Sequence, residues 1–498
     1  MHRDQVPNPC LTSSNRRLIV LLAIILLLSL VLRVGVALRF RNIYWPDEIY
    51  QSLEPAHHFA FGTGITSWEF RIGARSCLFP IFLAGVMRAT AWLGSGSDGY
   101  LLGVTVVLSL ISLTAVWFGF EWSYRVSGIN AAIVSGFASA FWYELIYFAP
   151  KAFNEVLAGH LLLPGLYLGT CGQERPSGRT WRLFLAGVFF GLAVGLRMQL
   201  APAVLLGAAY LCWKNPRKNL LPVAGGICLS VLVFGLVDAV TWSYPFHSYL
   251  TMLHFQITAR SRFGAQPWHY FLVQILSYYW PVIPFAFVGA RRSPFLGWMV
   301  LAIVIPHTLI PHKEWRFIYP ATPLLITLSG IGVAETVSAL NARLKLRWSA
   351  FAVVGLSVGF FLCTSAAIAA VFPYWKQYAG NLLAFQKLTR DDNVCGVALY
   401  KNSWVWSGGY TYLHRNVPIY LLTEELEVEK LAPSFNVIVT YKPLPEEHDS
   451  FGVVHCWDSR SYGGSHVPIL VCLYKRLGRC APGDSEHEVN ETLKRLGQ

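Results

Sequence analysis

The chain has few charged side chains for its length. Only 13% of its 498 residues are Asp, Glu, Lys or Arg, whereas 54% are hydrophobic. A single soluble globule of this size needs more polar surface than this composition supplies. The composition therefore excludes a soluble enzyme and indicates a membrane protein.

Acidic residues are scarcer than basic ones, 27 against 40, which gives a formal charge of +13. In a soluble protein this excess would suggest a nucleic-acid partner. Here the Lys and Arg residues concentrate in short loops between apolar segments, where they set the orientation of a membrane protein. We therefore expect no nucleic-acid partner.

Metal-binding cysteine patterns are also missing. The ten cysteines show no CxxC or Cys/His spacing. Those in or beside apolar segments are interpreted as packing residues: Cys10, Cys77, Cys171, Cys212, Cys228 and Cys363. The four in the polar tail can pair if the tail faces an oxidising compartment, and the sequence leaves their pairing open: Cys395, Cys456, Cys472 and Cys480.

What the chain has in abundance is long apolar segments, most of them near the roughly 20 residues that span a bilayer as a helix. They lie near residues 18–38, 76–94, 100–120, 128–149, 152–170, 183–213, 220–241, 270–289, 295–311, 317–336 and 349–372. This predicts about 11–12 transmembrane helices. The first segment is longer than the core of a signal peptide and is read as a retained helix.

Two of these segments leave alternatives open. The segment 183–213 is either one long helix or a hairpin that turns at Arg197, and one segment between 76 and 170 is either a full crossing or only partly inserted. Arg197 itself is costly inside a membrane, so it either belongs to a functional site or marks the turn.

The loop charges predict the organisation of the chain. Basic residues before the first span indicate a cytoplasmic tail over 1–17, a membrane domain over 18–372 and an exoplasmic loop over 39–75. After residue 373, short β-rich runs such as "FNVIVTY" predict a small soluble α/β domain over 373–498, also exoplasmic. The tail contains an N-glycosylation sequon at Asn490.

An unusually acidic stretch, "YWPDEIYQSLEPAHHFAFGTG", follows the first span. Its first proline suits the start of a helix, on which Asp47, Gln51, Glu54 and His58 would share one face. The opposite face is apolar, so we expect a helix lying flat on the bilayer that Pro55 ends or kinks near Glu54. The alternative is an interfacial float whose polar face only meets water.

A basic cluster, "HKEWRF" at 312–317, occupies another exoplasmic turn. Passing a sugar from a phosphate to an alcohol needs a base for the hydroxyl proton, and a carboxylate can serve. It also needs cations to neutralise the departing phosphate. The two clusters together therefore predict a site for a lipid-linked sugar donor.

Three stretches carry a resemblance to a known family: "PDEIYQSLEPAHHFAFGTGITSWEF" with "ARSCLFP", "TWSYPFHS" with "FGAQPWHYF", and "HKEWRFIYPATP". Over about residues 16–372 the chain resembles the mannosyltransferases of glycosyltransferase family 22, which have the GT-C fold. The first stretch is most similar to the glycosylphosphatidylinositol mannosyltransferase 3 type, with a bacterial homologue as the alternative.

The resemblance implies an inverting transfer of mannose from dolichyl or polyprenyl phosphate mannose to a lipid-linked glycan, with no metal or other cofactor. It implies that Asp47 is the general base and that Glu48 assists it, although Glu48 also suits a plain helix start. His312, Lys313 and Arg316 match the family's basic motif and are expected at the donor phosphate. Arg197 either binds the same phosphate or only marks the turn of its segment.

The remaining candidates are expected around the acceptor: Glu54, His58, Trp68, Glu69, Arg75 and Asp238. Each has a plainer alternative, since an interfacial Trp such as Trp68 is often a membrane anchor and Asp238 also suits a solvated helix end. Glu314 is expected to pair with a neighbouring base. His247, His254 and His269 are too loosely spaced to predict a metal site.

A transporter or flippase of lipid-linked sugars is the competing hypothesis, but the sequence shows no paired halves with broken helices. The expected partners are the bilayer, the polyprenyl-linked donor and the lipid-linked acceptor. The expected location is the endoplasmic reticulum membrane in a eukaryote or the inner membrane in a bacterium, with the active site exoplasmic.

Overall fold

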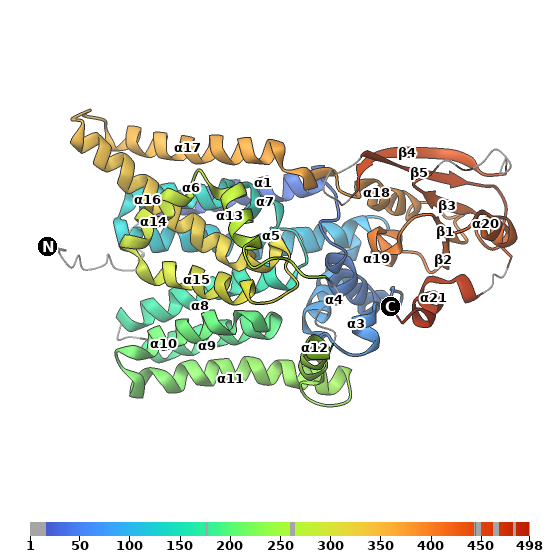
Figure 1. Ribbon diagram of the computed structural model, residues 1–498, viewed down its shortest axis with the longest axis horizontal. Coiled ribbons are helices and arrows are strands. Elements are labelled where there is room, and N and C mark those ends of the chain that lie inside the picture. The colour runs from blue at the N-terminus through green and yellow to red at the C-terminus, as the bar shows by residue number, and fades with distance from the viewer. Residues whose placement is uncertain are drawn as a thin grey trace. The chain divides into compact units, whose positions relative to one another are not determined.

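The computed structural model describes residues 16–174, 178–258, 264–442, 444, 450–461, 468–481 and 485–497. The cytoplasmic tail predicted for residues 1–17 lies almost wholly outside this range. Most of the described chain is helical, and the strands form one small sheet near the carboxyl end (Figure 1).

The chain divides into two compact units. The helical unit comprises Met1–Val36, Leu108–Leu236 and Leu253–Val371. The mixed unit comprises Ala37–Val107, Val237–Met252 and Phe372–Gln498, and it contains the sheet.

The α-helices are α1 (Arg16–Arg39), α2 (Glu54–Phe61), α3 (Trp68–Arg71), α4 (Leu78–Thr90), α5 (Asp98–Ser127), α6 (Ile129–Phe141), α7 (Tyr143–Tyr147), α8 (Asn154–Glu174), α9 (Arg179–Leu196), α10 (Ala201–Trp213), α11 (Pro216–Thr241), α12 (His247–Thr258), α13 (Tyr270–Tyr279), α14 (Ile283–Arg292), α15 (Pro294–Thr308), α16 (Thr322–Arg343), α17 (Ala350–Val371), α18 (Ala379–Leu388), α19 (Gly409–Leu413), α20 (Glu425–Leu431) and α21 (Val489–Arg495). The strands are β1 (Val397–Tyr400), β2 (Ile419–Leu422), β3 (Val437–Thr440), β4 (Gly452–Arg460) and β5 (Pro468–Lys475). Two further elements matter for the site: the π-helix η1 (Ile49–Leu53) and the 3₁₀-helix η4 (Trp315–Ala321).

The helices confirm a protein that crosses the membrane several times. Among the described residues, six helical segments are long and apolar enough to span a bilayer, or seven if the bent pair α13 and α14 is counted as one span. Four shorter apolar segments of 10–17 residues also occur. The lower predicted number of 11 crossings is therefore reached only if the bent pair and all four shorter segments cross as well.

The segment 183–213 is two helices. Helix α9 ends at Arg197, whose backbone is extended (φ −145°, ψ 95°), and α10 starts a few residues later. Gly207 of α10 lies close to the ring of Phe190 in α9, which places residues on either side of the turn against each other. Of the two alternatives left open by the sequence, the hairpin is therefore correct.

Small residues allow helices of the helical unit to pack closely. A Cβ on Gly289 in α14 would lie 2.0 Å from the carbonyl oxygen of Leu328 in α16, and a Cβ on Gly332 would lie 1.8 Å from that of Phe285. Helices in lipid associate largely through such close backbone contacts, because lipid tails are as apolar as the side chains. Figure 1 shows α8, α9 and α11 as neighbouring, nearly parallel helices of this unit.

The mixed unit contains a five-stranded sheet of order β2-β1-β3-β5-β4. Strand β1 pairs in parallel with β2 and β3, whereas β5 is antiparallel to β3 and β4. Alternate residues face opposite sides: Val397 and Leu399 pack in a cluster with α18, α19 and α21, while Ala398 and Tyr400 pack with α20. The sheet is thus covered by helices on both faces.

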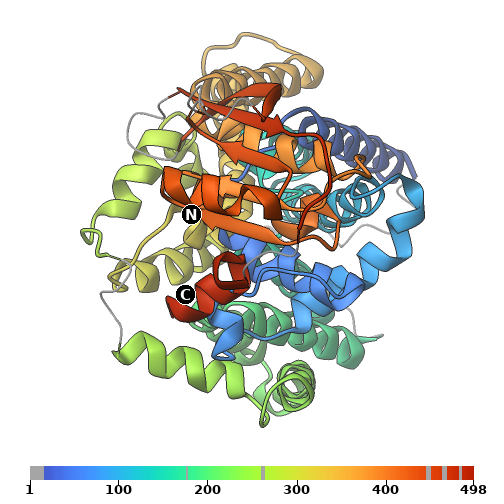
Figure 2. The same cartoon turned by 90° about the vertical axis from the view of Figure 1, so that its right-hand side faces the viewer.

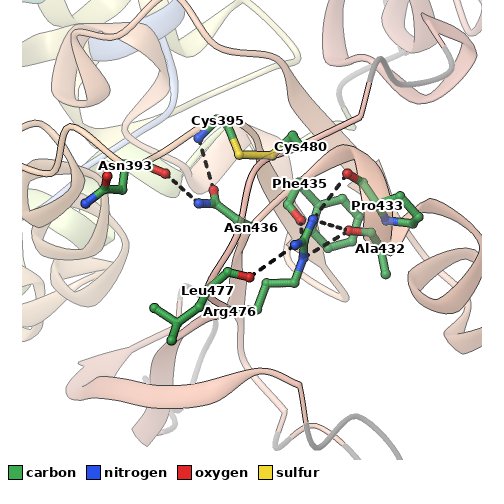
Figure 3. Close-up of a disulfide and its surroundings, with 9 residues drawn as sticks. All are labelled: Asn393, Cys395, Ala432, Pro433, Phe435, Asn436, Arg476, Leu477 and Cys480. Carbon is green, nitrogen blue, oxygen red and sulfur yellow. Dashed lines mark hydrogen bonds between the residues drawn. A yellow bond between two sulfur atoms is a disulfide. The ribbon is translucent and has the colours of Figure 1, made fainter.

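Two disulfides tie the mixed unit together, Cys395–Cys480 and Cys456–Cys472. Cys456 and Cys472 are directly opposed partners of β4 and β5. Figure 3 shows the Cys395–Cys480 bond, which joins two segments 85 residues apart in the sequence, next to Arg476. The four tail cysteines therefore pair with one another. Cys171 is also disulfide-bonded, so its interpretation as a simple packing residue was wrong.

The Arg476 side chain fixes the chain around this disulfide. It donates to the carbonyl oxygens of Ala432, Pro433 and Phe435 (Figure 3). Asn436, which follows Phe435, accepts a hydrogen bond from Cys395 N and donates one to the carbonyl oxygen of Asn393, two residues before Cys395. The backbone around the disulfide is therefore held by several hydrogen bonds from the Arg476 and Asn436 side chains.

Candidate active site

The acidic stretch forms one continuous helical segment with an irregular middle. It turns at Pro46, passes through the π-helix η1 and continues as α2 to Phe61, where Gly62 ends it in the left-handed conformation (φ 84°). Pro55 occupies the first turn of α2, where a missing N–H is tolerated. Of the two predicted effects of Pro55, an end of the helix near Glu54 is therefore wrong, whereas a change in the helix does fall there, where η1 gives way to α2.

Both interpretations of this helix were wrong: the helix lying flat on the bilayer on its apolar face, and the interfacial helix whose polar face only meets water. Gln51, Glu54 and His57 are buried, as are the apolar residues around them, and of the predicted polar face only His58 is exposed. A π-helical turn holds more residues than an α-helical turn, so it rotates the faces on either side of it relative to each other. The segment is therefore an internal element of the mixed unit.

The structure brings three of the predicted residues together in this unit. Arg75 Nη2 lies 3.8 Å from Glu69 Oε1, the same oxygen that accepts a 2.8 Å bond from Gln51 Nε2. The charge of Asp47 acts on Glu69 as well. We call Asp47, Gln51, Glu69 and Arg75 the carboxylate cluster.

Electrostatics distinguish the two acids of this cluster. Burial raises the pKa of the Glu69 carboxyl, Arg75 lowers it, and the negative charge of Asp47 raises it further, so that the net direction is upward. Asp47 is half-buried rather than enclosed. A pair of neighbouring acids in different surroundings is a common arrangement for proton transfer.

Glu54 lies away from this cluster and is completely buried. Its Oε2 accepts a 2.6 Å bond from Ile65 N, and its Oε1 accepts 2.6 Å bonds from both the amide and the hydroxyl of Thr411. Burial raises the pKa of Glu54 to about 7, although these bonds lower it. The structure therefore gives Glu54 a position at the start of α19, where it fixes the backbone.

The other candidates near the acidic stretch lie in different surroundings. Glu48 is buried and its charge acts on Tyr412, whereas the His58 side chain is exposed. Trp68 is half-buried at the start of α3, one residue before Glu69. His57 is the enclosed histidine of the stretch: its Nδ1 donates to Thr63 O at 2.6 Å, and its Nε2 lies 3.0 Å from His414 Nδ1.

Asp238 is fully buried rather than solvated. Its Oδ2 accepts bonds from the amide (2.9 Å) and the hydroxyl (2.6 Å) of Ser248 in the first turn of α12. Carboxylates in this position stabilise a helix start. The preceding turn places Phe246 at a positive φ of 63°, a strained conformation that often marks functional turns.

This turn packs against the segment that carries Glu69 and Arg75. Trp242 Nε1 donates to Arg75 O at 3.0 Å, and a Cβ on Gly73 would lie 2.6 Å from His247 Nε2. Gly73 also has a positive φ of 70°. Two of the stretches that the sequence singled out are therefore in contact within the mixed unit.

The basic candidates gather in the helical unit, in what we call the basic centre. Arg316 is 1% exposed and lies between two carboxylates: Nη1 donates to Glu155 Oε1 at 2.5 Å, and Nε donates to Glu314 Oε2 at 2.7 Å. Arg197 Nη1 lies 4.0 Å from the other oxygen of Glu155. The ring of Phe317 faces both guanidinium groups, with its centroid 4.4 Å from Arg197 Cζ and 5.1 Å from Arg316 Cζ.

The two remaining bases flank Arg316. His312 Nε2 lies 2.8 Å from Glu314 Oε1, which confirms that Glu314 pairs with neighbouring bases. Lys313 Nζ donates to Gln266 O at 2.9 Å. His312 has the most exposed side chain of the paired bases of this centre, at 31%. The structure therefore brings Arg197, Arg316 and His312 into one network and places Lys313 at its edge.

Sequence reasoning missed two buried charged residues of the helical unit, Glu155 of the basic centre and Arg33. Glu155, which pairs with both arginines, is a single acid at the start of an apolar segment. Arg33 was missed although it interrupts the first apolar segment, as Arg197 interrupts another. It is fully buried, and its Nη2 donates to Ser139 O at 3.1 Å.

Each centre has a distinct chemical capacity. The carboxylate cluster can accept a proton, and the basic centre can neutralise a phosphate. In the part of the chain that the structure describes, no three His, Cys, Asp or Glu side chains are arranged to hold a metal ion.

Comparison with protein families gives one match that covers most of the chain. Residues 24–398 match the model of the "Alg9-like mannosyltransferase family". This range includes the acidic stretch and both centres.

Curated relatives agree with this match. The chain is 26% identical to Mannosyltransferase APTG1 of Arabidopsis thaliana over 82% of this chain and 78% of that protein. It is 26% identical to GPI mannosyltransferase 3 of Yarrowia lipolytica over 79% of this chain and 75% of that protein. The human GPI alpha-1,2-mannosyltransferase 3 is 22% identical over 62% of this chain and 57% of its own length.

A solved structure has the same fold. ArnT from Cupriavidus metallidurans, described as bound to undecaprenyl phosphate, aligns with a TM-score of 0.59 and 14% identity over 92% of this chain and 98% of that protein. The apo form of the same protein gives a TM-score of 0.60. The fold is therefore that of the GT-C membrane glycosyltransferases.

Proposed function

Because the chain belongs to the Alg9-like mannosyltransferase family, and is thus a membrane mannosyltransferase, we propose that it transfers mannose from a polyprenyl phosphate mannose to a lipid-linked glycan. The acceptor we propose is a glycosylphosphatidylinositol precursor, the class named in the mannosyltransferases to which the chain is similar. Membership of an enzyme family favours this reading over a transporter or flippase.

The observation that carries the proposal is the carboxylate cluster. Asp47 is half-buried at the start of an irregular helix, and it shares its surroundings with Glu69, whose pKa is raised. In the proposed reaction Asp47 takes the proton of the acceptor hydroxyl as that oxygen attacks the anomeric carbon. Glu69, held by Gln51 and Arg75, orients the acceptor side of the site.

We propose a single displacement with inversion, because the mechanism then needs one base and no covalent sugar–enzyme intermediate. The leaving group is a polyprenyl phosphate, whose growing negative charge needs cations rather than a proton. Arg316, Arg197 and Lys313 supply positive charge in the basic centre, and His312 is its more exposed member. With these cations present, we propose that the reaction needs no metal ion.

A lipid-linked donor is in keeping with the fold. A protein of this fold has been solved with undecaprenyl phosphate, and the many apolar helices of this chain place it in the bilayer where such lipids are found. The two disulfides of the mixed unit support an oxidising compartment for that unit. We therefore propose an active site on the exoplasmic side, which is the lumen of the endoplasmic reticulum in a eukaryote.

The decisive experiment is transfer by membranes that contain the protein. Labelled polyprenyl phosphate mannose is supplied, and the lipid that acquires the label is identified by mass spectrometry. We expect label on a glycosylphosphatidylinositol precursor, with inverted anomeric configuration, and an unchanged rate after chelation of divalent cations. Label on no lipid-linked glycan would contradict the proposal.

Asp47→Asn tests the base within the same assay. It keeps the shape of the side chain and removes its basicity, so we expect the rate to fall by roughly 10²–10⁴-fold. The control is Asp392→Asn, because the Asp392 side chain is 96% exposed. If Asp47→Asn membranes transfer mannose as fast as the control, Asp47 is not the base.

A further inference from the structure

One motif from the sequence has no part in the proposed chemistry. Asn490-Glu491-Thr492 has the form of an N-glycosylation acceptor, and it lies in α21 near the carboxyl end. A glycan would be attached to the side-chain amide nitrogen of Asn490. The contacts of that amide therefore decide whether the motif is available.

The Asn490 amide is engaged at both of its atoms. Its Oδ1 accepts a 3.0 Å bond from Thr66 N, and its Nδ2 donates a 3.2 Å bond to Gly64 O. The side chain thus pairs with the backbone of two alternate residues, as a neighbouring strand would. Such a two-point contact fixes both the position and the direction of the bound segment.

Helix α21 is itself firmly held in the mixed unit. Val489 and Leu493 are fully buried in the same hydrophobic cluster as Ile65. Glu488, just before the helix, forms a bridge with Tyr420 of β2. Helix α21 is therefore a fixed support for the segment that Asn490 contacts.

Arg71 of α3 adds a third contact between α21 and this segment. Arg71 Nη2 donates to Asn490 O at 2.9 Å, and Arg71 Nε donates to Thr66 O at 3.0 Å. The carboxylate of Glu54 binds Ile65 N from its own side. The backbone of residues 64–66 is therefore held by Glu54 and by Asn490 at once. Figure 2 shows the dark red C-terminal helix beside the blue segment that contains these residues.

This segment leads directly into the carboxylate cluster. Residues 64–67 lie in the connection between α2 and α3, and α3 carries Glu69. Glu69 binds Gln51 and is influenced by Asp47. A shift of the connection would therefore move Glu69 relative to the proposed base.

We propose that Asn490 is a positioning residue. Its amide clamps the backbone of Gly64 and Thr66 and so keeps Glu69 in the position relative to Asp47 that the acceptor requires. In the folded protein it carries no glycan. The statement about the acceptor rests on the proposed function, whereas the clamp and the missing glycan do not.

The test compares Asn490→Ala with Thr492→Ala. Both changes destroy the sequon, but only the first removes the clamp; Thr492 loses no more than a hydroxyl bond to Glu486 O. Hydrogen exchange at the Thr66 amide is measured on the full chain in detergent. We expect exchange at least tenfold faster in Asn490→Ala and unchanged in Thr492→Ala, with Ile65, which Glu54 holds, less affected.

Kinetics add a readout that a merely structural role would not move. We expect Asn490→Ala to raise the KM for the acceptor roughly tenfold, as expected for the loss of two hydrogen bonds, and to leave the KM for the donor unchanged. Asn490→Asp keeps the acceptor for Thr66 N and should restore part of the effect. A variant that is only less well folded would contain less active enzyme, but its KM values for the acceptor and for the donor would both stay unchanged.

The outcomes separate the two proposals. If Asn490→Ala matches Thr492→Ala in Thr66 exchange and acceptor KM, the clamp is wrong. A mobility shift of the wild-type protein after glycosidase treatment, absent in Thr492→Ala, would show that Asn490 carries a glycan and overturn the inference. If the wild type transfers no mannose, the proposed function fails while the exchange experiment still tests the clamp.

Discussion

The basic centre of the helical unit and the carboxylates of Glu54 and Asp238 in the mixed unit are stabilised by different means. In the helical unit, Arg316 lies between Glu155 and Glu314, so that charge is paired with charge. In the mixed unit, the fully buried carboxylates of Glu54 and Asp238 are held by backbone amides and hydroxyl groups. The first arrangement is an ion network and the second consists of neutral donors around an anion.

The difference matters for function. In an ion network an entering phosphate can replace a carboxylate as the partner of an arginine, because both are anions with similar hydrogen-bonding geometry. A carboxylate held by backbone amides has no such exchangeable partner and instead fixes the local structure. The basic centre is thus suited to binding, and Glu54 and Asp238 are suited to positioning.

The largest expected effect comes from breaking the ion network. Glu155→Gln leaves Arg316 and Arg197 without a shared counter-charge, and the loss of one partner of a buried pair costs about 3–5 kcal/mol. Thermal unfolding in detergent measures it. The control is Glu335→Gln, which breaks the exposed pair with Arg292 and should cost less than about 1 kcal/mol. Equal effects of the two changes would contradict the assigned role of the network.

The next largest effect tests how tightly the uncharged surroundings enclose the Glu54 carboxylate. Gly409 has a positive φ of 56°, and a Cβ there would lie 2.4 Å from Glu54 Oε1. Gly409→Ala should cost about 3 kcal/mol, from backbone strain and overpacking. Gly62 also has a positive φ but nothing within 4 Å of a Cβ, so Gly62→Ala should cost only about 1 kcal/mol. If the two variants lose the same free energy of unfolding, Glu54 does not restrict the residue at position 409.

The third prediction concerns pH. Burial lowers the pKa of His57 to about 4, with a further lowering by His414. Because its folded pKa lies below the ordinary value of 6.5, neutral His57 stabilises the fold above pH 6.5, and this contribution is lost as the pH falls toward 4. We expect a loss on the order of 2 kcal/mol over this range.

Unfolding measured at several pH values checks this prediction. The matched variant is His57→Gln, which cannot gain a proton and should show a flatter pH dependence. His58→Gln is the control, because His58 is exposed. An unchanged slope in His57→Gln would show that another group is responsible.

The smallest expected effect comes from removing one neutral donor. Ser248→Ala deletes the hydroxyl that binds Asp238 Oδ2 but keeps the backbone bond, so we expect a loss of about 1 kcal/mol. Ser403→Ala is the control, since Ser403 is exposed and makes no capping bond. A loss as large as that of Glu155→Gln would remove the distinction between the two kinds of charge stabilisation.

The sequence predicted the class of protein and many of its elements. Long apolar segments predicted the helices, because only such helices satisfy their backbone in lipid. Four of the β-rich runs form β1, β2, β3 and β5. Strand β4 was missed because its residues are largely exposed and form no apolar run.

The candidate site was predicted in part. The resemblance singled out Asp47, Glu69 and Arg75, which lie together, and Arg316 and His312, which share Glu314. The prediction that Glu54 and His58 share one helical face with Asp47 assumed an unbroken α-helix, whereas a π-helical turn intervenes, and Glu54 is buried while His58 is exposed. The catalytic and binding roles of these residues stay predictions.

By itself, the sequence determined that this chain lies in a membrane, where its basic and acidic motifs fall, and which family it resembles, because composition and local motifs are properties of the linear chain. Only the tertiary structure decided which charges meet. Glu155 pairs with an arginine 161 residues away, and Asn490 contacts a connection more than 400 residues earlier in the chain. No local pattern records such contacts, since they depend on how distant helices pack.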